Sequence, residues 1–252
     1  MKLGTALAPL VDLIYPPRCP ACGEGLAAQE GLCSACWGEL VFPPEPACPG
    51  CMRALPSVGS DEALEATELA GSLCGACRAD PPPHDGAFAG TLYTAASRKL
   101  VLALKHGGKI ALAPMLARMI AARLPELEGD WLLVPVPLHR MRLWKRGYNQ
   151  SALLARELAR LRGKTLLVDG LVRPKATSPL GELGKAERAR MLESAIAVNP
   201  RRAGQIAGAQ VVLVDDVLTS GATTNVCVQV LRQAGAQRVL VACFARVLDE
   251  QR

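Results

Sequence analysis

Two adjacent carboxylates precede a loop of small and hydroxyl-bearing residues in the C-terminal part of the chain. The carboxylates are Asp215 and Asp216, and the loop runs Thr219-Ser220-Gly221-Ala222-Thr223. Backbone N–H groups at the start of a helix bind anions such as phosphate, and carboxylates accept hydrogen bonds from sugar hydroxyls. The spacing therefore suits a ligand with a phosphate at one end and a cis-diol a short distance away, the shape of ribose 5-phosphate.

The loop departs from two common nucleotide-binding loops. It lacks the G-x-x-x-x-G-K-[ST] spacing of nucleoside-triphosphatases and the G-x-G-x-x-G spacing of dinucleotide folds. Together with the apolar run Val211 to Val214, the acids and the loop instead resemble the signature of the type I phosphoribosyltransferases. The resemblance implies that the acids hold the ribose hydroxyls of phosphoribosyl pyrophosphate (PRPP) and that the loop cradles its 5′-phosphate, with Mg²⁺ alongside. An ordinary turn between a strand and a helix is the alternative interpretation.

Strands and helices alternate around these residues. The β-favouring run Val211 to Val214 predicts a strand buried on both faces, as in a parallel sheet. A helix should follow from Thr224 to Ala234 and stop at Gly235, because glycine adopts a left-handed backbone readily. Further strands are expected at residues 131–136 and 239–244, and further helices at residues 97–106, 112–124 and 150–161, the last capped by Asn149. The pattern predicts an α/β fold whose ligands bind beyond the carboxyl ends of parallel strands.

Eight of the ten cysteines fall in four C-x-x-C pairs in the N-terminal part of the chain. The pairs are Cys19/Cys22, Cys33/Cys36, Cys48/Cys51 and Cys74/Cys77. Two thiolates at this spacing bind one side of a tetrahedral zinc ion, and a second pair completes the four Zn–S bonds. The four pairs therefore predict two structural zinc sites. Whether neighbouring pairs combine in order or interleave stays open at this stage.

Other uses of paired cysteines fit the sequence less well. A disulfide framework is typical of secreted chains, whereas a nucleotide-type domain follows these pairs. A redox-active C-x-x-C suits a single pair better than four pairs that all precede the strand–helix pattern. The other two cysteines, Cys227 and Cys243, fall in an expected helix and an expected strand, where buried, unreactive thiols are the simplest interpretation.

The chain changes character near the run Pro81-Pro82-Pro83. Residues 1–83 carry 4 Lys and Arg against 10 Asp and Glu, a net charge of −6, whereas residues 84–252 carry 25 against 13, a net charge of +12. We therefore expect a first domain over residues 1–83 and a second over residues 84–252. The negative charge of the first domain argues against nucleic-acid binding by this domain and favours a structural or partner-docking role.

The length of 252 residues and the hydrophobic content of 50% allow a sizeable core and a smaller domain. No stretch approaches the roughly 18 uninterrupted apolar residues that a membrane span needs. The segment from Leu3 to Tyr15 is apolar but contains Asp12, and no small-residue cleavage site precedes Pro16-Pro17. We interpret this segment as a short amphipathic helix rather than a signal peptide, which predicts a cytoplasmic protein.

A second candidate site is the basic loop after the expected strand at residues 131–136. Its cations are Arg140, Arg142, Lys145 and Arg146. The runs Pro135-Val136-Pro137-Leu138-His139-Arg140 and Arg146-Gly147-Tyr148-Asn149-Gln150, with Leu104-Lys105-His106-Gly107, the cysteine pairs and the acidic motif, resemble the ComF/GntX family along nearly the whole chain. That family joins an N-terminal double zinc ribbon to a phosphoribosyltransferase-like domain, and it takes its name from a protein needed for DNA uptake in competent bacteria.

The resemblance implies a helix and a double zinc ribbon in the first domain and a type I phosphoribosyltransferase-like parallel sheet with flanking helices in the second. It suggests a role in DNA uptake or in nucleotide-related metabolism. By analogy, the four cations of the basic loop would lie against the pyrophosphate of PRPP, where positive charge stabilises the departing group. Lys185 and Arg188 would belong to a hood over the site. The catalytic residues, the acceptor and turnover itself stay open.

A different class of function also fits the basic loop. Cations interleaved with Trp144 and Tyr148 resemble a track for single-stranded DNA, in which cations hold phosphates and rings stack on bases. A loop that only caps the next helix, with Trp144 packed inward, is the plainer alternative. A third hypothesis is a non-catalytic adaptor that joins DNA-uptake proteins, such as a helicase, through the zinc domain.

Overall fold

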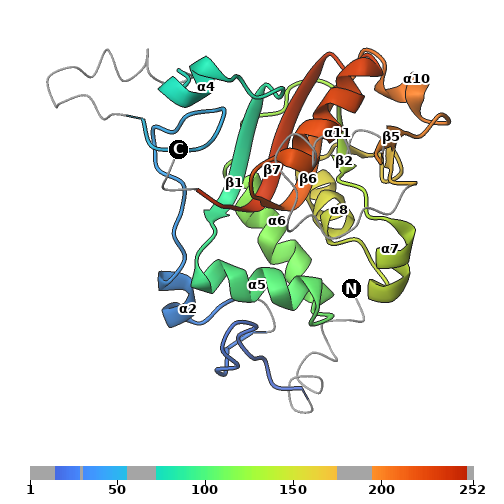
Figure 1. The fold of residues 1–252 in the computed structure, drawn as a ribbon. Coiled ribbons are helices and arrows are strands. Elements are labelled where there is room, and N and C mark those ends of the chain that lie inside the picture. Colours follow the sequence, from blue (N-terminus) through green and yellow to red (C-terminus); the bar gives the residue numbers. More distant parts are fainter. Residues whose placement is uncertain (1–14, 29–30, 56–71, 175–194, 249–252) are drawn as a thin grey trace, which may run out of the picture.

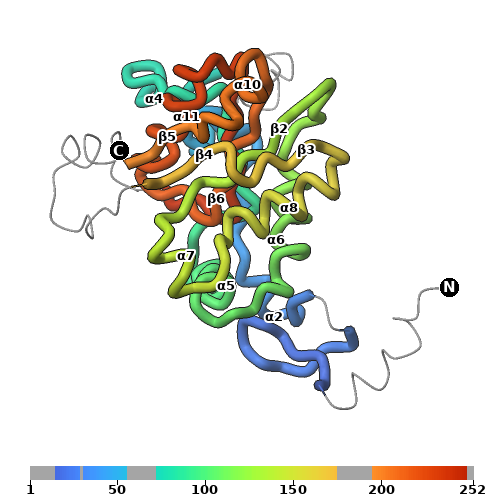
Figure 2. Tube along the Cα trace, turned by 90° about the vertical axis from the view of Figure 1, so that its right-hand side faces the viewer, coloured from blue at the N-terminus to red at the C-terminus, as the bar shows by residue number. Residues whose placement is uncertain are grey.

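The computed structural model describes residues 15–28, 31–55, 72–174 and 195–248. Five parallel strands form the central sheet: β1 (Gly86–Leu92), β2 (Trp131–Pro135), β3 (Thr165–Leu166), β6 (Gln210–Leu218) and β7 (Arg238–Arg246). They lie in the order β1-β7-β6-β2-β3; Figure 1 shows β1, β7, β6 and β2, and Figure 2 shows β3. A small antiparallel pair joins β4 (Leu171–Val172) to β5 (Ala197–Val198). The expected parallel α/β fold is confirmed.

Helices cover both faces of the sheet (Figure 1, Figure 2). Alternate residues of β6 enter two separate cores, because successive side chains of a strand point to opposite faces. Val212 and Val214 pack with residues of α5, α6 and α8, whereas Val211 and Leu213 pack with residues of α11. The helical segments are α2 (Ser34–Gly38), α4 (Gly75–Ala79), α5 (Ala95–Lys105), η1 (Ile110–Leu112, a 3₁₀ turn), α6 (Ala113–Ala121), α7 (Arg140–Arg146), α8 (Gln150–Arg162), α10 (Ala203–Ile206) and α11 (Ala222–Gln233).

Helix ends follow the capping signals in the sequence. The expected cap Asn149 is confirmed, since its Oδ1 accepts a hydrogen bond of 3.0 Å from the Ser151 N–H at the start of α8. Gly235 follows the C-cap residue Ala234 of α11 and has a φ of +91°, as the sequence predicts. The helices expected at residues 97–106, 112–124, 150–161 and 224–234 correspond to α5, α6, α8 and α11, with shifted ends.

Two sequence-based boundaries are wrong. Strand β6 continues to Leu218, so Asp215 and Asp216 lie inside the strand instead of following it. The expected loop at residues 137–147 contains helix α7, in which no side chain is buried. This helix begins after His139, whose Nδ1 accepts a hydrogen bond of 3.3 Å from the Met141 N–H, and it ends at Gly147 with a φ of +79°. A helix without a buried face gives no apolar periodicity, which is why the sequence did not predict it.

The cysteine-bearing segment runs along the outer edge of the sheet, beside β1 (Figure 1). The Leu92 N–H donates to the Val41 carbonyl at 2.7 Å, and the Ala87 N–H donates to the Pro49 carbonyl at 2.8 Å. The segment between these contacts thus lies against a strand that has a partner, β7, on its other side. The proposed division of the chain at residues 83/84 stays a prediction.

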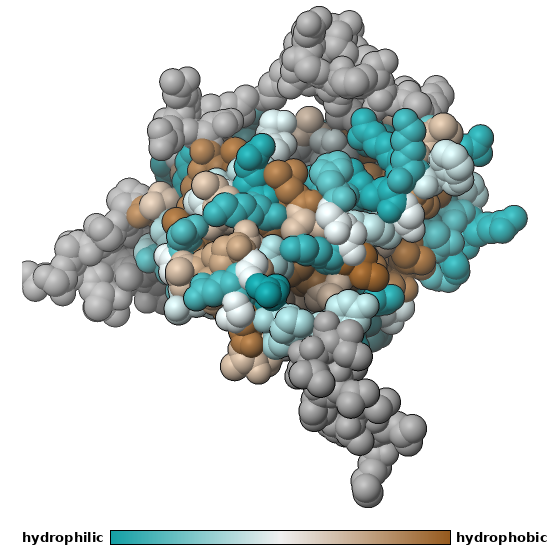
Figure 3. Space-filling view, turned by 90° about the horizontal axis from the view of Figure 1, so that it is seen from below, coloured by the Kyte–Doolittle hydropathy of each residue, from teal (hydrophilic) through white to brown (hydrophobic). Residues whose placement is uncertain are grey.

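Some sequence-based expectations lie outside the described residues. They concern the helix expected from Leu3 to Tyr15, of which the structure describes Tyr15, and the hood residues Lys185 and Arg188. Within the described ranges, no helix has both the length and the apolar character that crossing a membrane requires. The face seen from the side of α5 in Figure 3 mixes hydrophilic and hydrophobic side chains.

Candidate functional site

The eight paired cysteines form two clusters that combine the pairs in sequence order. In each cluster the four sulfur atoms lie within 4.8 Å of one another; the first cluster is Cys19, Cys22, Cys33 and Cys36, and the second is Cys48, Cys51, Cys74 and Cys77. The Cys22 and Cys33 sulfurs are 3.6 Å apart, as are those of Cys51 and Cys74. Four Zn–S bonds of about 2.3 Å place sulfurs about 3.8 Å apart, whereas a disulfide is about 2.05 Å long. The clusters fit two zinc ions.

Short helices position the second half of each cluster. Cys33 is the N-cap of α2 and Cys74 is the N-cap of α4, and the last cysteine of each cluster lies buried within that helix. Backbone N–H groups also donate to the sulfurs: that of Cys36 to Cys33 Sγ at 3.5 Å and that of Cys74 to Cys48 Sγ at 3.3 Å. Such bonds stabilise thiolates, the form in which cysteine binds metal.

A cavity of about 400 Å³, here called the central cavity, lies at the carboxyl ends of β2 and β6. Six of the eleven residues predicted to bind PRPP line it: Asp215, Asp216, Thr219, Thr223, Arg142 and Arg146. Acidic, hydroxyl and basic groups from separate parts of the chain therefore meet in one place. This position is the one that parallel α/β sheets generally offer to ligands.

Both acids contribute to the central cavity although they are neighbours in a strand. Asp215 Oδ1 accepts hydrogen bonds from Ser151 Oγ at 3.0 Å and from the Asp216 N–H at 2.8 Å. Asp216 is 4% exposed, and its Oδ2 lies 2.8 Å from Lys105 Nζ. The Val217 N–H donates to Asp216 Oδ1 at 2.9 Å. Each carboxylate is thus held in place, and Asp216 is paired with the ammonium of Lys105.

The surroundings of Asp215 change its acidity. Burial, and then the adjacent charge of Asp216, raise the pKa of Asp215 to about 7. The hydrogen bonds from the Asp216 N–H and from Ser151, and the charge of Lys105, oppose this shift without cancelling it. Near neutral pH the site therefore holds a carboxyl group that can carry or release a proton beside one that is paired with a lysine.

We expect Asp215 to make the folded protein less stable as the pH rises. Its folded-state pKa lies above that of an ordinary Asp, so the folded protein keeps this proton to a higher pH than the unfolded chain does. The free energy of unfolding should therefore fall between about pH 4 and about pH 7 through this group. Denaturant unfolding across this range should show the decline in the wild type and a weaker decline in Asp215→Asn. If the free energy of unfolding declined equally with pH in the two proteins, this prediction would be contradicted.

The segment of residues 219–223, here called the 219–223 loop, runs from the end of β6 into the first turn of α11. Gly221 has a φ of +78° and precedes the first helical residue, Ala222. A side chain at Gly221 would be strained at this φ and would approach Asn225 Oδ1 to 3.4 Å. Within the described chain no side chain caps this end of the 12-residue helix, so its first N–H groups face the loop. Ser220, Gly221 and Ala222 belong to this loop but not to the cavity wall.

Helix α7 supplies the basic part of the site. Arg142, Lys145 and Arg146 line an adjoining cavity of about 440 Å³, with Lys105 and Tyr148 on its other walls. The guanidinium of Arg146 also donates to Gln150 Oε1 at 2.6 Å. Because Lys105, Arg142 and Arg146 line both this cavity and the central cavity, the two cavities are neighbours. Arg140, in contrast, is exposed and lines neither one.

The polar residues that line the central cavity also include Lys105, Ser151 and Arg173, which the sequence did not mark as ligand-binding. Lys105 is the last residue of α5 and Ser151 lies in the first turn of α8, so only the fold brings them to Asp215 and Asp216. Burial, and then the charge of Arg142, lower the pKa of Arg173. The run Leu104-Lys105-His106-Gly107 did stand out by resemblance, but nothing in it indicated a carboxylate as the partner of Lys105.

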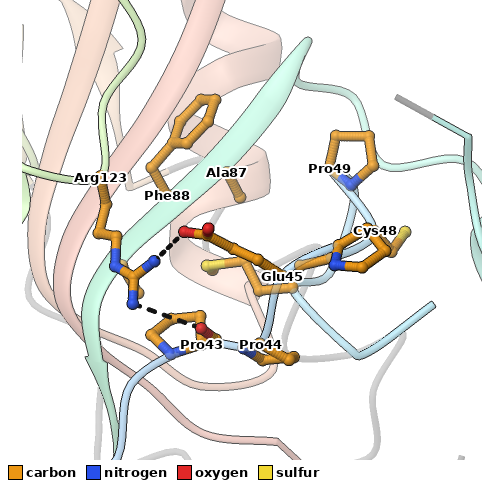
Figure 4. A pocket seen from close by; sticks show the side chains of 12 residues that line it. Pro43, Pro44, Glu45, Cys48, Pro49, Ala87, Phe88 and Arg123 are labelled. Atoms are coloured by element: carbon orange, nitrogen blue, oxygen red, sulfur yellow. Dashed lines mark hydrogen bonds and ion pairs between the residues drawn. The ribbon is translucent and has the colours of Figure 1, made fainter. Parts of the chain in front are cut away.

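A further cavity, of about 320 Å³, lies beside β1 and the second cysteine cluster (Figure 4). Prolines 43, 44, 46 and 49 and Phe88 form much of its wall. The guanidinium of Arg123 pairs with the Glu45 carboxylate and lies 3.4 Å from the Pro43 carbonyl, as Figure 4 shows. Apart from Cys48, the residues predicted to bind a metal or PRPP do not line it.

Two family models match successive parts of the chain. The model of the double zinc ribbon domain matches residues 10–78, and that of the phosphoribosyl transferase domain matches residues 149–252. A solved structure entitled "Structure of the allosteric regulatory enzyme of purine biosynthesis" aligns with a TM-score of 0.40 and 20% identity over 57% of this chain and 30% of that one.

Relatives of similar length match along almost the whole sequence. The DNA utilization protein YhgH of Salmonella typhimurium is 32% identical over 94% of this chain and 100% of its own. The protein of the same name from Escherichia coli K12 is 30% identical over 94% of this chain and 100% of its own length. Competence protein F of Haemophilus influenzae is 29% identical over 91% of this chain and 96% of its own length. With two cysteine clusters followed by a phosphoribosyltransferase domain, the chain belongs to the family of YhgH and competence protein F, the ComF family.

Proposed function

We propose that this protein binds PRPP together with Mg²⁺ in the central cavity and acts in the uptake or use of DNA. The observation that carries the proposal is the meeting of Asp215, Asp216, Thr219 and Thr223 with the arginines of α7 in one cavity. The names of the relatives, which refer to DNA utilization and competence, support the cellular role.

Each part of PRPP has a chemical counterpart in this arrangement. The 219–223 loop and the first turn of α11 would receive the 5′-phosphate, because free N–H groups at a helix start attract anions. Asp215 and Asp216 would accept hydrogen bonds from the ribose hydroxyls. The pyrophosphate would reach Arg142, Arg146 and Lys145, in the adjoining cavity. Carboxylates and phosphate oxygens are the hard ligands that Mg²⁺ prefers.

Lys105 links the two halves of this proposed site. Its Nζ pairs with Asp216 Oδ2, and its side chain lines both cavities. The ammonium would orient the Asp216 carboxylate toward the ribose hydroxyls and would also face the pyrophosphate. In a transfer reaction, pyrophosphate would leave C1 of the ribose as an acceptor enters, and these cations would stabilise the negative charge that collects on it. Bound Mg²⁺ would neutralise part of the same charge.

Replacing Arg142, Lys145 and Arg146 by Ala together should weaken PRPP binding at least tenfold and leave ribose 5-phosphate binding nearly unchanged. Only PRPP reaches the adjoining cavity, and a hydrogen bond to a charged group contributes about 1.5–3 kcal/mol. Calorimetry with Mg²⁺ and each ligand measures the difference. Arg140→Ala is the matched control, because this exposed arginine lies on the same helix but lines neither cavity. Equal losses for both ligands would contradict the assignment of α7 to the pyrophosphate.

Single-stranded DNA is the second candidate ligand, favoured by one observation. Trp144 is 80% exposed on α7 among the basic residues, so the inward packing considered from the sequence is wrong. If DNA is the main ligand of α7, Trp144→Ala should cost about 1–3 kcal/mol in DNA affinity, and each lost phosphate contact should reduce the salt slope by about 0.7. Such losses, combined with unchanged PRPP affinity in the triple Ala variant, would make DNA the primary ligand. An adaptor role through the zinc-binding part stays a hypothesis.

A further inference from the structure

Arg246 connects the second cysteine cluster to the 219–223 loop. Its Nε donates to the carbonyl of Cys51 at 3.2 Å, and its Nη1 donates to the carbonyls of Leu218, at 3.0 Å, and Thr219. One planar guanidinium thus reaches a cluster residue, the end of β6 and the first residue of the loop. Because the N–H groups of a guanidinium have fixed directions, this group sets the relative positions of the three carbonyls.

The backbone of Arg246 is itself firmly placed. It is the last residue of β7, and in the sheet register it lies opposite Leu92 of β1 and Leu218 of β6. The Tyr93 N–H donates to its carbonyl at 2.8 Å. The side chain therefore starts from a fixed point in the sheet, so a shift of the Cys51 carbonyl has to change the hydrogen bonds of Arg246 instead of moving its backbone.

The cysteine end of this connection has an unusual backbone. Met52, which directly follows Cys51, has a φ of +65°, a conformation that side-chain-bearing residues rarely adopt. The equivalent position of the first cluster, after Cys22, holds Gly23 with a φ of +84°. Met52 is 3% exposed and belongs to the same apolar core as Leu218 and Ala87. The protein thus keeps a strained turn in the second cluster and uses its side chain to fasten that turn to the sheet.

The metal would hold this turn together. The Met52 N–H donates to the Cys48 carbonyl at 2.7 Å, which closes the turn around the two cysteine side chains. A zinc ion bound by both cysteines cross-links the same turn, and its loss removes that restraint from a backbone that is already strained. The Cys51 carbonyl would then leave its position, and Arg246 would lose the hydrogen bond that its Nε donates to that carbonyl.

We propose that Arg246 is a positioning residue through which zinc in the second cluster fixes the binding shape of the 219–223 loop. Occupancy of this cluster thus raises the affinity of the loop for phosphate, and by thermodynamic reciprocity a phosphate ligand slows loss of zinc from this cluster. The inference rests on the proposed function only in taking a phosphate group as the ligand of the loop.

The first cluster offers a matched comparison. The described contacts of the first cluster do not involve the 219–223 loop. Lys109 Nζ donates to the Pro20 carbonyl at 3.2 Å, and the buried cysteines of the cluster pack with Ala21, Leu26 and Leu32. Loss of zinc from the first cluster should therefore leave the 219–223 loop undisturbed, although both clusters have the same ligand set. A general effect of metal on stability would act through either cluster, whereas the proposed connection acts through the second alone.

The test uses full-length protein made under zinc-replete conditions, as the wild type and with Arg246→Gln, Arg246→Lys, Cys77→Ser or Cys36→Ser. Amide hydrogen exchange is followed without ligand over a peptide that spans residues 218–226, and ribose 5-phosphate affinity is measured by calorimetry. Arg246→Gln should keep two zinc ions, exchange faster in this peptide and bind ribose 5-phosphate at least about fivefold more weakly, the lower end of typical coupling between sites. Arg246→Lys should recover only part of the affinity, because an ammonium lacks the forked geometry.

Comparison of the cysteine variants completes the test. Cys77→Ser should reproduce the effect of Arg246→Gln, the double variant should be no weaker than either single variant, and Cys36→Ser should behave like the wild type. Unchanged exchange in Arg246→Gln and Cys77→Ser would overturn the inference, and so would additive losses of affinity. A wild type that binds no ribose 5-phosphate would refute the proposed function, while the ligand-free exchange measurement would still decide whether Arg246 positions the loop.

Discussion

Asp216→Asn is expected to weaken binding of both PRPP and ribose 5-phosphate at least tenfold. The ribose hydroxyls are common to the two ligands, and a hydrogen bond to a charged group contributes about 1.5–3 kcal/mol, where about 1.4 kcal/mol corresponds to tenfold. The buried carboxylate lies 2.8 Å from Lys105 Nζ, so the substitution also removes the partner of that ammonium. Asp215→Asn should have a similar effect. Calorimetric titration with Mg²⁺ and each ligand measures the losses.

Asp169→Asn is the control for this experiment. Asp169 also forms an ion pair, with Arg202 Nε at 2.9 Å, but it does not line the central cavity. Its replacement should leave both affinities unchanged. If the wild type bound neither ligand, the proposed function would fall. If Asp216→Asn bound both as well as the wild type, the ribose hydroxyls could not be assigned to this carboxylate.

Cys48→Ser is expected to lower the zinc content from two ions to one per chain and to unfold mainly the segment around the second cluster. Cys48 is fully buried, and its sulfur accepts a hydrogen bond from the Cys74 N–H. A structural site contributes its binding free energy to folding, about 10–16 kcal/mol in isolated zinc-finger peptides. Elemental analysis gives the zinc content, and limited proteolysis locates the unfolded segment.

Cys227→Ala provides the matched substitution for the zinc experiment. Cys227 is equally buried, but it lies on α11 and belongs to neither cluster. This variant should retain both zinc ions. Two zinc ions in Cys48→Ser would show that Cys48 is dispensable as a ligand. Fewer than two in wild-type protein made under reducing, zinc-replete conditions would overturn the assignment of two sites.

The sequence predicts those parts of the fold that bury an apolar pattern or carry a sharp local signal. Val211 to Val214 predicted a strand of the parallel sheet, and Asn149 predicted the start of α8. Helix α7 was missed because it buries no side chain, although His139 and Gly147 bracket it with capping signals. Strand β1 was missed because its sequence, Gly86-Ala-Phe-Ala-Gly-Thr-Leu92, consists mainly of small residues.

Spatial pairing is the information that local patterns lack. The four C-x-x-C pairs predicted two metal sites, but only the fold shows that they combine in order. Likewise, the acids and the 219–223 loop were evident as a motif, whereas Lys105 and Ser151 come from distant helices and meet Asp216 and Asp215 through packing. A single sequence contains no signal for such pairs, because neither partner lies within a few residues of the other.

The two outer strands of the central sheet, β1 and β3, differ in length and in what lies beside them. On one side β3 has only two residues, too few to recruit another chain. On the other side β1 is seven residues long and would offer unpaired N–H and C=O groups, but the cysteine-bearing segment contacts it through Val41 and Pro49. Exposed strand margins are templates for self-association and aggregation. The metal-binding segment therefore covers a margin at which another chain could pair, and we expect protein prepared without zinc to be less soluble.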